Sequence, residues 1–222
     1  VGEEWIKGRT FVDVGCGSGL FALAAAVNGA SRVVAFDVSP NSIEASKANA
    51  ERLSGELKSR VSPEFQVGSI LDRQFIATLG TYQIVYAWGV LHHTGAMWDA
   101  IRATAGLVDP DGGRLAIAIY NKHWTSPLWK QVKRFYNTVP HRLRFLINYP
   151  FAAAIYLGVW ATCRENPLRK ERGMDFWYDV IDWLGGYPYE YASQGEVRRV
   201  LEAAGLRQTT VRQQRCQTGC NE

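Results

Sequence analysis

Residues Phe11–Pro40 read FVDVGCGSGLFALAAAVNGASRVVAFDVSP, and this stretch decides the fold. Its first apolar run predicts a buried strand over Phe11–Val14. Three glycines at alternate positions then predict a turn whose backbone approaches a ligand closely, and an alanine-rich helix follows over Leu20–Asn28. A second apolar run, Arg32–Phe36, predicts the next strand and leads to Asp37. Strand, helix and strand in this order predict a unit of a parallel sheet.

The acids and glycines of this stretch predict a nucleoside cofactor site. Asp37 stands at the C-terminal end of a strand, where a carboxylate accepts hydrogen bonds from both ribose hydroxyls. A dinucleotide site needs the spacing G-x-G-x-x-G, whereas Gly15, Gly17 and Gly19 are spaced G-x-G-x-G and Asp13 precedes them. This pattern, D-x-G-x-G-x-G, resembles motif I of class I S-adenosylmethionine (SAM) methyltransferases. A tight turn that binds no ligand is the alternative that glycines alone leave open.

The resemblance to motif I implies SAM as the cofactor and S-adenosylhomocysteine as the product. In that family the acid interacts with the cationic amino group of the methionine moiety, often through water. The glycines leave room for the carboxylate and the sulfur of the same moiety. Ser69 and Ile70 lie where the family holds adenine, and Trp88 ends a predicted strand, where core packing is the alternative to a cofactor contact. The expected cofactor-binding residues are Asp13, Gly15, Cys16, Gly17, Gly19, Asp37, Val38, Ser69, Ile70 and Trp88.

Strands and helices alternate along the rest of the chain, which predicts an α/β fold with a Rossmann-like, doubly wound and mostly parallel sheet. Further helices are expected over Asn41–Leu53, Met97–Leu107 and Gln194–Ala204, and further strands over Phe65–Val67, Gln83–Trp88, Gly113–Tyr120 and Leu206–Val211. The resemblance also implies an antiparallel last strand. It should begin at Gly219–Glu222, where the sequence stops, so we expect this strand to be cut short or missing. With 222 residues, 47% of them apolar, we expect a single domain over residues 1–222, with a helical cap inserted at residues 123–192.

Longer segments extend the resemblance over nearly the whole chain. They are GSILDRQFIATLG, YAWGVLHHTGAMWDAI, IAIYNKHWTSPLWKQVKRFYNTVP, RGMDFWYDVIDWLGGYPYEYAS and GCNE. These segments resemble a bacterial methyltransferase family of unassigned acceptor that is grouped with ubiquinone-biosynthesis O-methyltransferases. The ubiquinone enzymes place acids with a histidine after the fourth strand, where this chain has Trp-Gly-Val-Leu-His-His. We therefore expect no metal ion, and quinone-precursor acceptors are not carried over.

Polar side chains follow the predicted fourth and fifth strands, at the edge of the sheet where ligands bind in open α/β folds. His92 and His93 are the candidate general bases, because a neutral imidazole with a pKa of about 6.5 can take an acceptor proton near neutral pH. The sequence does not choose between them, and a histidine that bonds the backbone or caps a helix is the alternative. Tyr120 and Asn121 are expected to orient the acceptor or touch the cofactor.

Nucleic acid is a disfavoured partner. The net charge is only +4, and the chain lacks both the Asn/Asp-Pro-Pro-aromatic loop of base amino-methyltransferases and a Pro-Cys nucleophile. The basic residues at 130, 133, 134, 142 and 144 recur at helical spacing among aromatic residues. That spacing favours a solvated helix face over a nucleic-acid contact.

The predicted cap is the part of the chain expected to define the acceptor. Residues 145–163 carry no charge, and we expect first a buried lid helix, then a dimer contact, then a shallow membrane-surface helix. Trp183 and Tyr189 lie among carboxylates, a mixture that suits a sugar or a ring-bearing metabolite; an aromatic plug that packs the cap onto the sheet is the alternative.

These observations together predict a SAM-dependent methyltransferase that methylates an oxygen atom of a small molecule or of a glycan or lipid precursor. The alternatives are a nicotinamide-dependent oxidoreductase, which the glycine spacing opposes, and a noncatalytic scaffold or membrane-surface partner with the same fold. The predicted location is the reducing cytoplasm. The four cysteines lack the spacing of a disulfide framework, and no hydrophobic leader stands ahead of the first strand.

Overall fold

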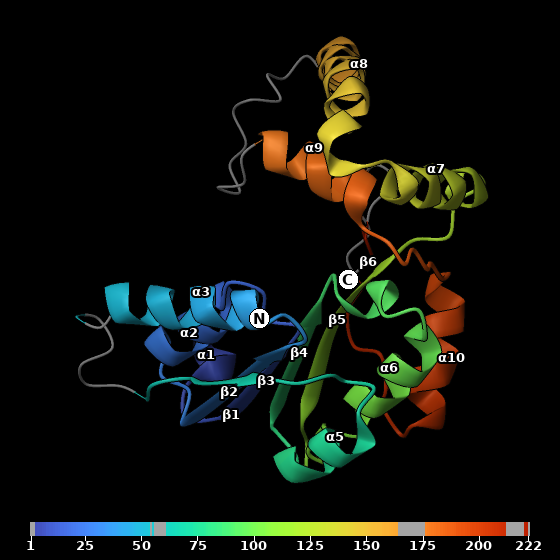
Figure 1. Cartoon of the computed structure of the whole chain (residues 1–222). Coiled ribbons are helices and arrows are strands. Elements are labelled where there is room, and N and C mark those ends of the chain that lie inside the picture. The colour runs from blue at the N-terminus through green and yellow to red at the C-terminus, as the bar shows by residue number, and fades with distance from the viewer. Residues whose placement is uncertain (1–2, 54, 56–60, 164–175, 212–219, 222) are drawn as a thin grey trace. The chain divides into compact units, whose positions relative to one another are not determined.

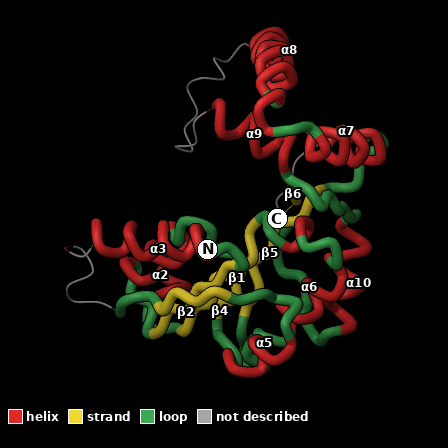
Figure 2. The backbone as a smooth tube through the Cα atoms, viewed as in Figure 1, coloured by secondary structure: helices red, strands yellow, loops and turns green. Residues whose placement is uncertain are grey.

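The computed structural model divides the chain into two compact units, Val1–Lys122 with Tyr191–Glu222 and His123–Glu190 (Figure 1). It describes residues 3–53, 55, 61–163, 176–211 and 220–221. Every strand drawn in Figure 2 belongs to the first unit, and the described elements of the second unit are helices. Each unit has its own core of buried apolar side chains.

The first unit is built around a sheet with the strand order β3-β2-β1-β4-β5-β6. The strands are β1 (Thr10–Val14), β2 (Arg32–Asp37), β3 (Glu64–Val67), β4 (Ile84–Trp88), β5 (Arg114–Tyr120) and β6 (Cys220–Asn221). All neighbours among β1 to β5 are parallel, and β6 pairs antiparallel with β5. The strand order reverses between β1 and β4, which confirms the predicted doubly wound, mostly parallel sheet and creates a crevice at that point.

Helices cover both faces of this sheet. They are α1 (Glu3–Ile6), α2 (Leu20–Val27), α3 (Pro40–Arg52), α5 (Arg73–Leu79), α6 (Met97–Ala105) and α10 (Gln194–Ala203), with the short 3-10 helix η1 (Leu91–His93). Because successive strand residues point to opposite faces, Val12 and Val85 join a core with α5, α6 and α10, whereas Phe11 and Ile84 join a core with α1, α2 and α3. Both faces are apolar, as buried parallel strands require.

Helix α5 was not predicted from the sequence. Its N-cap is Asp72, whose carboxylate accepts the backbone N–H groups of Gln74 at 2.9 Å and Phe75 at 3.2 Å. Phe75 and Ile76 then pack against the core. An acidic cap followed within one turn by apolar residues is a helix-start signal, so the sequence carried the information for this element.

The predicted strand over Leu206–Val211 is wrong. These residues follow α10 without strand pairing, and residues 207–210 are exposed. A strand needs a hydrogen-bonding neighbour, and none of the described strands pairs with Leu206–Val211; β6 pairs with Ile119 and Tyr120 of β5 instead. The antiparallel last strand, which was expected to be cut short or missing, is present as the two residues of β6.

The second unit packs its helices around a small core of its own. The helices are α7 (Ser126–Thr138), η2 (His141–Leu143), α8 (Phe145–Cys163) and α9 (Phe176–Gly185). Tyr136, Ala152, Val180 and Leu184 are its buried apolar residues. Lys133 is also buried, and its ammonium group donates a hydrogen bond to the backbone carbonyl of Trp183. This bond joins α7 to α9 and satisfies a charge that would otherwise be costly to bury.

Helix α8 is not the buried lid that was expected first. Ala152 faces the core and Tyr156 approaches Phe176 of α9, but Leu157 is 61% exposed and Trp160 is 59% exposed. The reason is that apolar residues surround the whole helix, whereas α9 packs against one side of it. In the described part of the chain, no helix combines the length and apolar character needed to cross a membrane.

Candidate active site at the carboxyl edge of the sheet

The glycine-rich turn after β1 lies at the crevice where the strand order reverses. Gly15 has φ of 70°, and a Cβ atom there would lie 2.3 Å from a side-chain methyl group of Val90, in the turn after β4. Gly17 has φ of 53°, and a Cβ atom there would meet nothing within 4 Å. Gly19 is the N-cap of α2. The turn is therefore closely packed at Gly15 and open at Gly17, as a turn that receives a ligand requires.

Asp37 fixes this turn against the end of β2. One carboxylate oxygen, Oδ2, accepts the backbone N–H of Gly17 at 3.0 Å, and the other, Oδ1, accepts that of Ser39 at 2.9 Å. Each carboxylate oxygen can accept more than one hydrogen bond, so Asp37 can still receive ligand hydroxyls. Val38, predicted to be its neighbour in the site, is 68% exposed.

Asp13 is the unusual titratable group of the crevice. It is only 2% exposed, and its Oδ2 atom has no hydrogen-bond partner in the described part of the chain. Burial raises the pKa of Asp13 to about 7; the backbone N–H of Ala22 lowers it, and the nearby Asp37 charge raises it further. A buried carboxylate without a counter-charge is costly, so a cationic ligand group would stabilise its ionised form.

Cys16 contributes packing rather than reactivity. Its thiol is buried and lies 3.9 Å from the hydroxyl of Ser46. Burial raises the pKa of the Cys16 thiol to about 12, and the Asp13 charge raises it further. Only the thiolate is a good nucleophile or metal ligand. No group of three or more His, Cys, Asp or Glu side chains that could hold a metal ion is found among the described residues.

The residues expected beside adenine form the turn between β3 and α5. The backbone N–H of Gly68 donates to the carbonyl of Asp37 at 3.0 Å, which holds this turn next to the end of β2. Ser69 Oγ accepts the N–H of Leu71 at 3.2 Å, and Ile70 is buried in the core. Ser69 and Ile70 therefore lie in a turn that is held beside the end of β2.

Trp88, at the end of β4, packs on a neighbouring ring. Its indole is parallel to the ring of Tyr86, with an interplanar angle of 2° and centroids 5.6 Å apart. One face of Trp88 is therefore packed on Tyr86, as the core-packing alternative predicts. The residue as a whole is half-buried.

The two candidate bases and Tyr120 gather at the ends of β4 and β5. His92 is 1% exposed, and its Nδ1 accepts the backbone N–H of Tyr120 at 3.3 Å. His93 is half-buried and meets the Tyr120 ring edge-on, with centroids 5.5 Å apart. The two histidines thus have different surroundings: His92 bonds the backbone, and His93 is the more accessible of the two.

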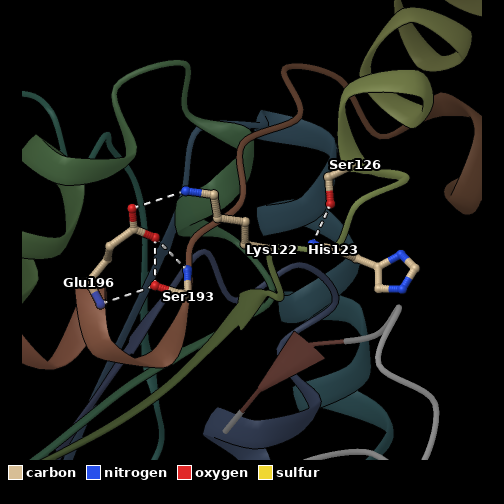
Figure 3. Close-up of polar contacts among 5 residues, drawn as sticks. All are labelled: Lys122, His123, Ser126, Ser193 and Glu196. Atoms are coloured by element: carbon tan, nitrogen blue, oxygen red, sulfur yellow. Dashed lines mark hydrogen bonds and ion pairs between the residues drawn. The ribbon is translucent and has the colours of Figure 1, made fainter.

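A network that was not singled out from the sequence holds the chain just beyond Tyr120. Asn121 forms a parallel bridge with Ala192. Figure 3 shows Lys122 paired with Glu196 at 3.3 Å, and Glu196 bonded to the backbone and hydroxyl of Ser193. Serine followed three residues later by glutamate is the signature of a capping box, so the sequence carried this signal at the start of α10.

The second unit begins with a separate hydrogen bond, also drawn in Figure 3, in which the backbone N–H of His123 donates to Ser126 Oγ at 2.9 Å. Trp183 and Tyr189, the predicted acceptor residues, lie in this unit. Trp183 meets the ring of Trp129 edge-on at 5.0 Å, and the buried Tyr189 lies 5.1 Å from the ammonium of Lys133. Both residues therefore have their described contacts within the second unit.

The chain is similar to known proteins in both sequence and fold. A family model described as "Methyltransferase domain" matches residues 3–211. The structure of PKMT2 from Rickettsia typhi in complex with AdoHcy is 14% identical, with a TM-score of 0.60 over 90% of this chain and 39% of that chain. This likeness supports the fold.

Short stretches also match ribosomal protein L11 methyltransferases. The protein from Tolumonas auensis is 55% identical over 47 residues, and the one from Alteromonas mediterranea is 56% identical over 47 residues. Each match covers 21% of this chain and 16% of the relative. The chain thus spans only a small part of these relatives.

Proposed function

Because the chain belongs to the methyltransferase-domain family, we propose that it binds SAM beyond β1 and β4 and methylates an oxygen atom of an acceptor. The acceptor class that we propose is a small molecule or a glycan or lipid precursor. The family match agrees with the resemblance to class I SAM methyltransferases that the sequence motifs carry. The names of the matching relatives do not decide the acceptor, because the chain spans only 16% of their length.

The observation that carries the proposal is the unpartnered, buried Oδ2 atom of Asp13 beside an open glycine turn. A cationic amino group, such as that of the methionine moiety, would supply the missing counter-charge. Asp37 would accept the ribose hydroxyls, and the Ser69 turn would border the base. A pyrophosphate would instead bring negative charge toward Asp13, so this electrostatic arrangement opposes the nicotinamide alternative.

Bound SAM supplies an activated methyl group. An acceptor hydroxyl that took this methyl group would have to lose its proton. The residues of the chain have to align the acceptor, exclude water and take up that proton. Tyr120 and Asn121, at the end of β5, are proposed to orient the acceptor.

We assign the proton-accepting role to His93 rather than to His92. The buried His92 accepts the backbone N–H of Tyr120, so it holds the end of β5 in place. His93 is half-buried beside the Tyr120 ring, where an acceptor hydroxyl can approach it. The acceptor role is not extended to Trp183 and Tyr189, because both pack within the second unit.

Calorimetric titration of the chain with S-adenosylhomocysteine, beside NAD and NADP in the same buffer, tests the cofactor. Micromolar binding of S-adenosylhomocysteine alone is expected, and Asp37→Ala should weaken it. Binding of NAD or NADP instead would revive the oxidoreductase alternative. Binding without turnover of any phenol or sugar offered with labelled SAM would favour a noncatalytic scaffold.

Single-turnover assays on an acceptor that is methylated separate the two histidines. His93→Ala should lower the rate about 100-fold and leave the affinity for S-adenosylhomocysteine unchanged. His92→Ala removes a buried hydrogen-bond acceptor, so it should lower thermal stability as well as the rate. Full activity of His93→Ala would refute the assignment.

A further inference from the structure

Helix α8 exposes a continuous apolar face in the second unit. Phe145, Leu146, Tyr149, Leu157 and Trp160 are each between 51% and 63% exposed. At 100° per residue these positions fall within an arc of about 120° of the helix. We call these five residues the α8 face. The opposite side of the helix, which contains Ile147, Phe151 and Ile155, packs against the core of the unit.

An exposed face of this composition is unusual for a soluble surface. No charged residue occurs between Phe145 and Cys163, and no acidic residue occurs between His123 and Cys163. Soluble proteins rarely expose a contiguous apolar patch unless something binds it. We therefore expect the α8 face to bind a partner.

The basic residues of the same unit indicate the charge of that partner. Arg142 is exposed in η2, which comes before α8, and Lys130 and Arg134 are exposed on α7. Arg144 is held instead by the carbonyl of Val139 at 3.1 Å and lies over the ring of Tyr136. The acidic residues of the second unit all follow Cys163 in the sequence, so this helical region attracts anions.

We propose that the α8 face binds the surface of a bilayer that contains anionic lipids. Apolar and aromatic side chains would enter the boundary between headgroups and acyl chains, and Arg142, Lys130 and Arg134 would add attraction to the lipid phosphates. Tryptophan and tyrosine favour this boundary because each has an apolar ring and a polar group. A second copy of the chain fits the face less well, since it would bring the same basic residues together.

Co-sedimentation of the full chain with vesicles tests the proposal without any methyl transfer. The vesicles are phosphatidylcholine alone and phosphatidylcholine mixed with phosphatidylglycerol. Binding is expected to the mixed vesicles only, and it should weaken as salt is raised. Leu157→Glu/Trp160→Glu and Arg134→Glu/Arg142→Glu should each lower the partition coefficient at least about tenfold.

Matched controls lie on α3 of the first unit, where exposed residues receive the same changes. Ala45→Glu/Ala48→Glu and Lys47→Glu/Arg52→Glu should bind the mixed vesicles as the wild type does. The proposal is overturned by absent binding, by equal binding to both kinds of vesicle, or by equal losses in the controls. It also fails if the wild type forms a dimer that Leu157→Glu/Trp160→Glu dissociates while neither protein binds vesicles.

Discussion

The carboxyl group of Asp13 couples the chemistry of the site to the stability of the fold. In the absence of a cation, burial raises its pKa from 3.8 to about 7. The folded state then holds a proton that the unfolded state loses near pH 4. The contribution of Asp13 to stability is therefore greatest below that pH, falls as pH rises toward 7, and is constant above it.

The affinity for S-adenosylhomocysteine should consequently increase as pH rises through about 7. Only ionised Asp13 can pair with the ligand ammonium group, so calorimetry should give a dissociation constant about tenfold lower at pH 8 than at pH 6. Asp13→Asn should bind more weakly and lose this pH dependence. An unchanged pH dependence in Asp13→Asn would assign the titration to another group.

Much of the site could be predicted at this scale because its residues are contiguous. The glycine turn and Asp37 belong to one strand-turn-helix-strand stretch, whose local geometry the sequence pattern indicates. The difference between His92 and His93 could not be predicted, since it depends on the backbone N–H of Tyr120, which comes from another strand. Periodicity carries no information about such a contact.

At the scale of elements, local signals account for both the successes and the failure. Serine is a preferred N-cap residue, and Ser39 caps α3: its hydroxyl accepts the N–H of Ser42 at 3.3 Å. The predicted strand Leu206–Val211 failed because a strand depends on a neighbour that no local pattern supplies. Helices carry their own hydrogen bonds and caps, so they are more readily identified from sequence than edge strands.

The capping box of α10 should make a pH-dependent contribution to stability. Hydrogen bonds from Ser193, and then the charge of Lys122, lower the pKa of Glu196 to about 2. This contribution is present above pH 4.5, the ordinary value, and is lost as pH falls toward 2. Urea unfolding should therefore show a smaller deficit for Glu196→Gln at pH 3.5 than at pH 6.

Ser193→Ala is the companion variant, since it removes the hydroxyl that bonds Glu196. It should cost about 1 kcal/mol at pH 6. Arg198→Ala, which removes the exposed pair with Glu202 on the same helix, is the control and should cost less. Equal losses of stability for Glu196→Gln at both pH values would contradict the proposed role of the capping box.

At the scale of the whole molecule, the chain has two units whose buried cores share no residue. The core of the first unit follows from alternating strand patterns, which are visible in the sequence. The second unit could be outlined only as a helical cap, because its core depends on which sides of α7, α8 and α9 meet. In α8 apolar residues lie on all sides, so its sequence does not show which side is buried.

Separate cores predict that the two units lose structure separately. Leu184→Ala opens a cavity in the second unit and should cost about 2–5 kcal/mol there. Hydrogen exchange should accelerate in α7 and α9 and remain unchanged in β1 and β4, and the affinity for S-adenosylhomocysteine should persist. Leu23→Ala, at a buried leucine of α2, should show the reverse pattern. If Leu184→Ala accelerated exchange equally in β1, the two units would form one cooperative structure, and the core of the second unit would support the cofactor site.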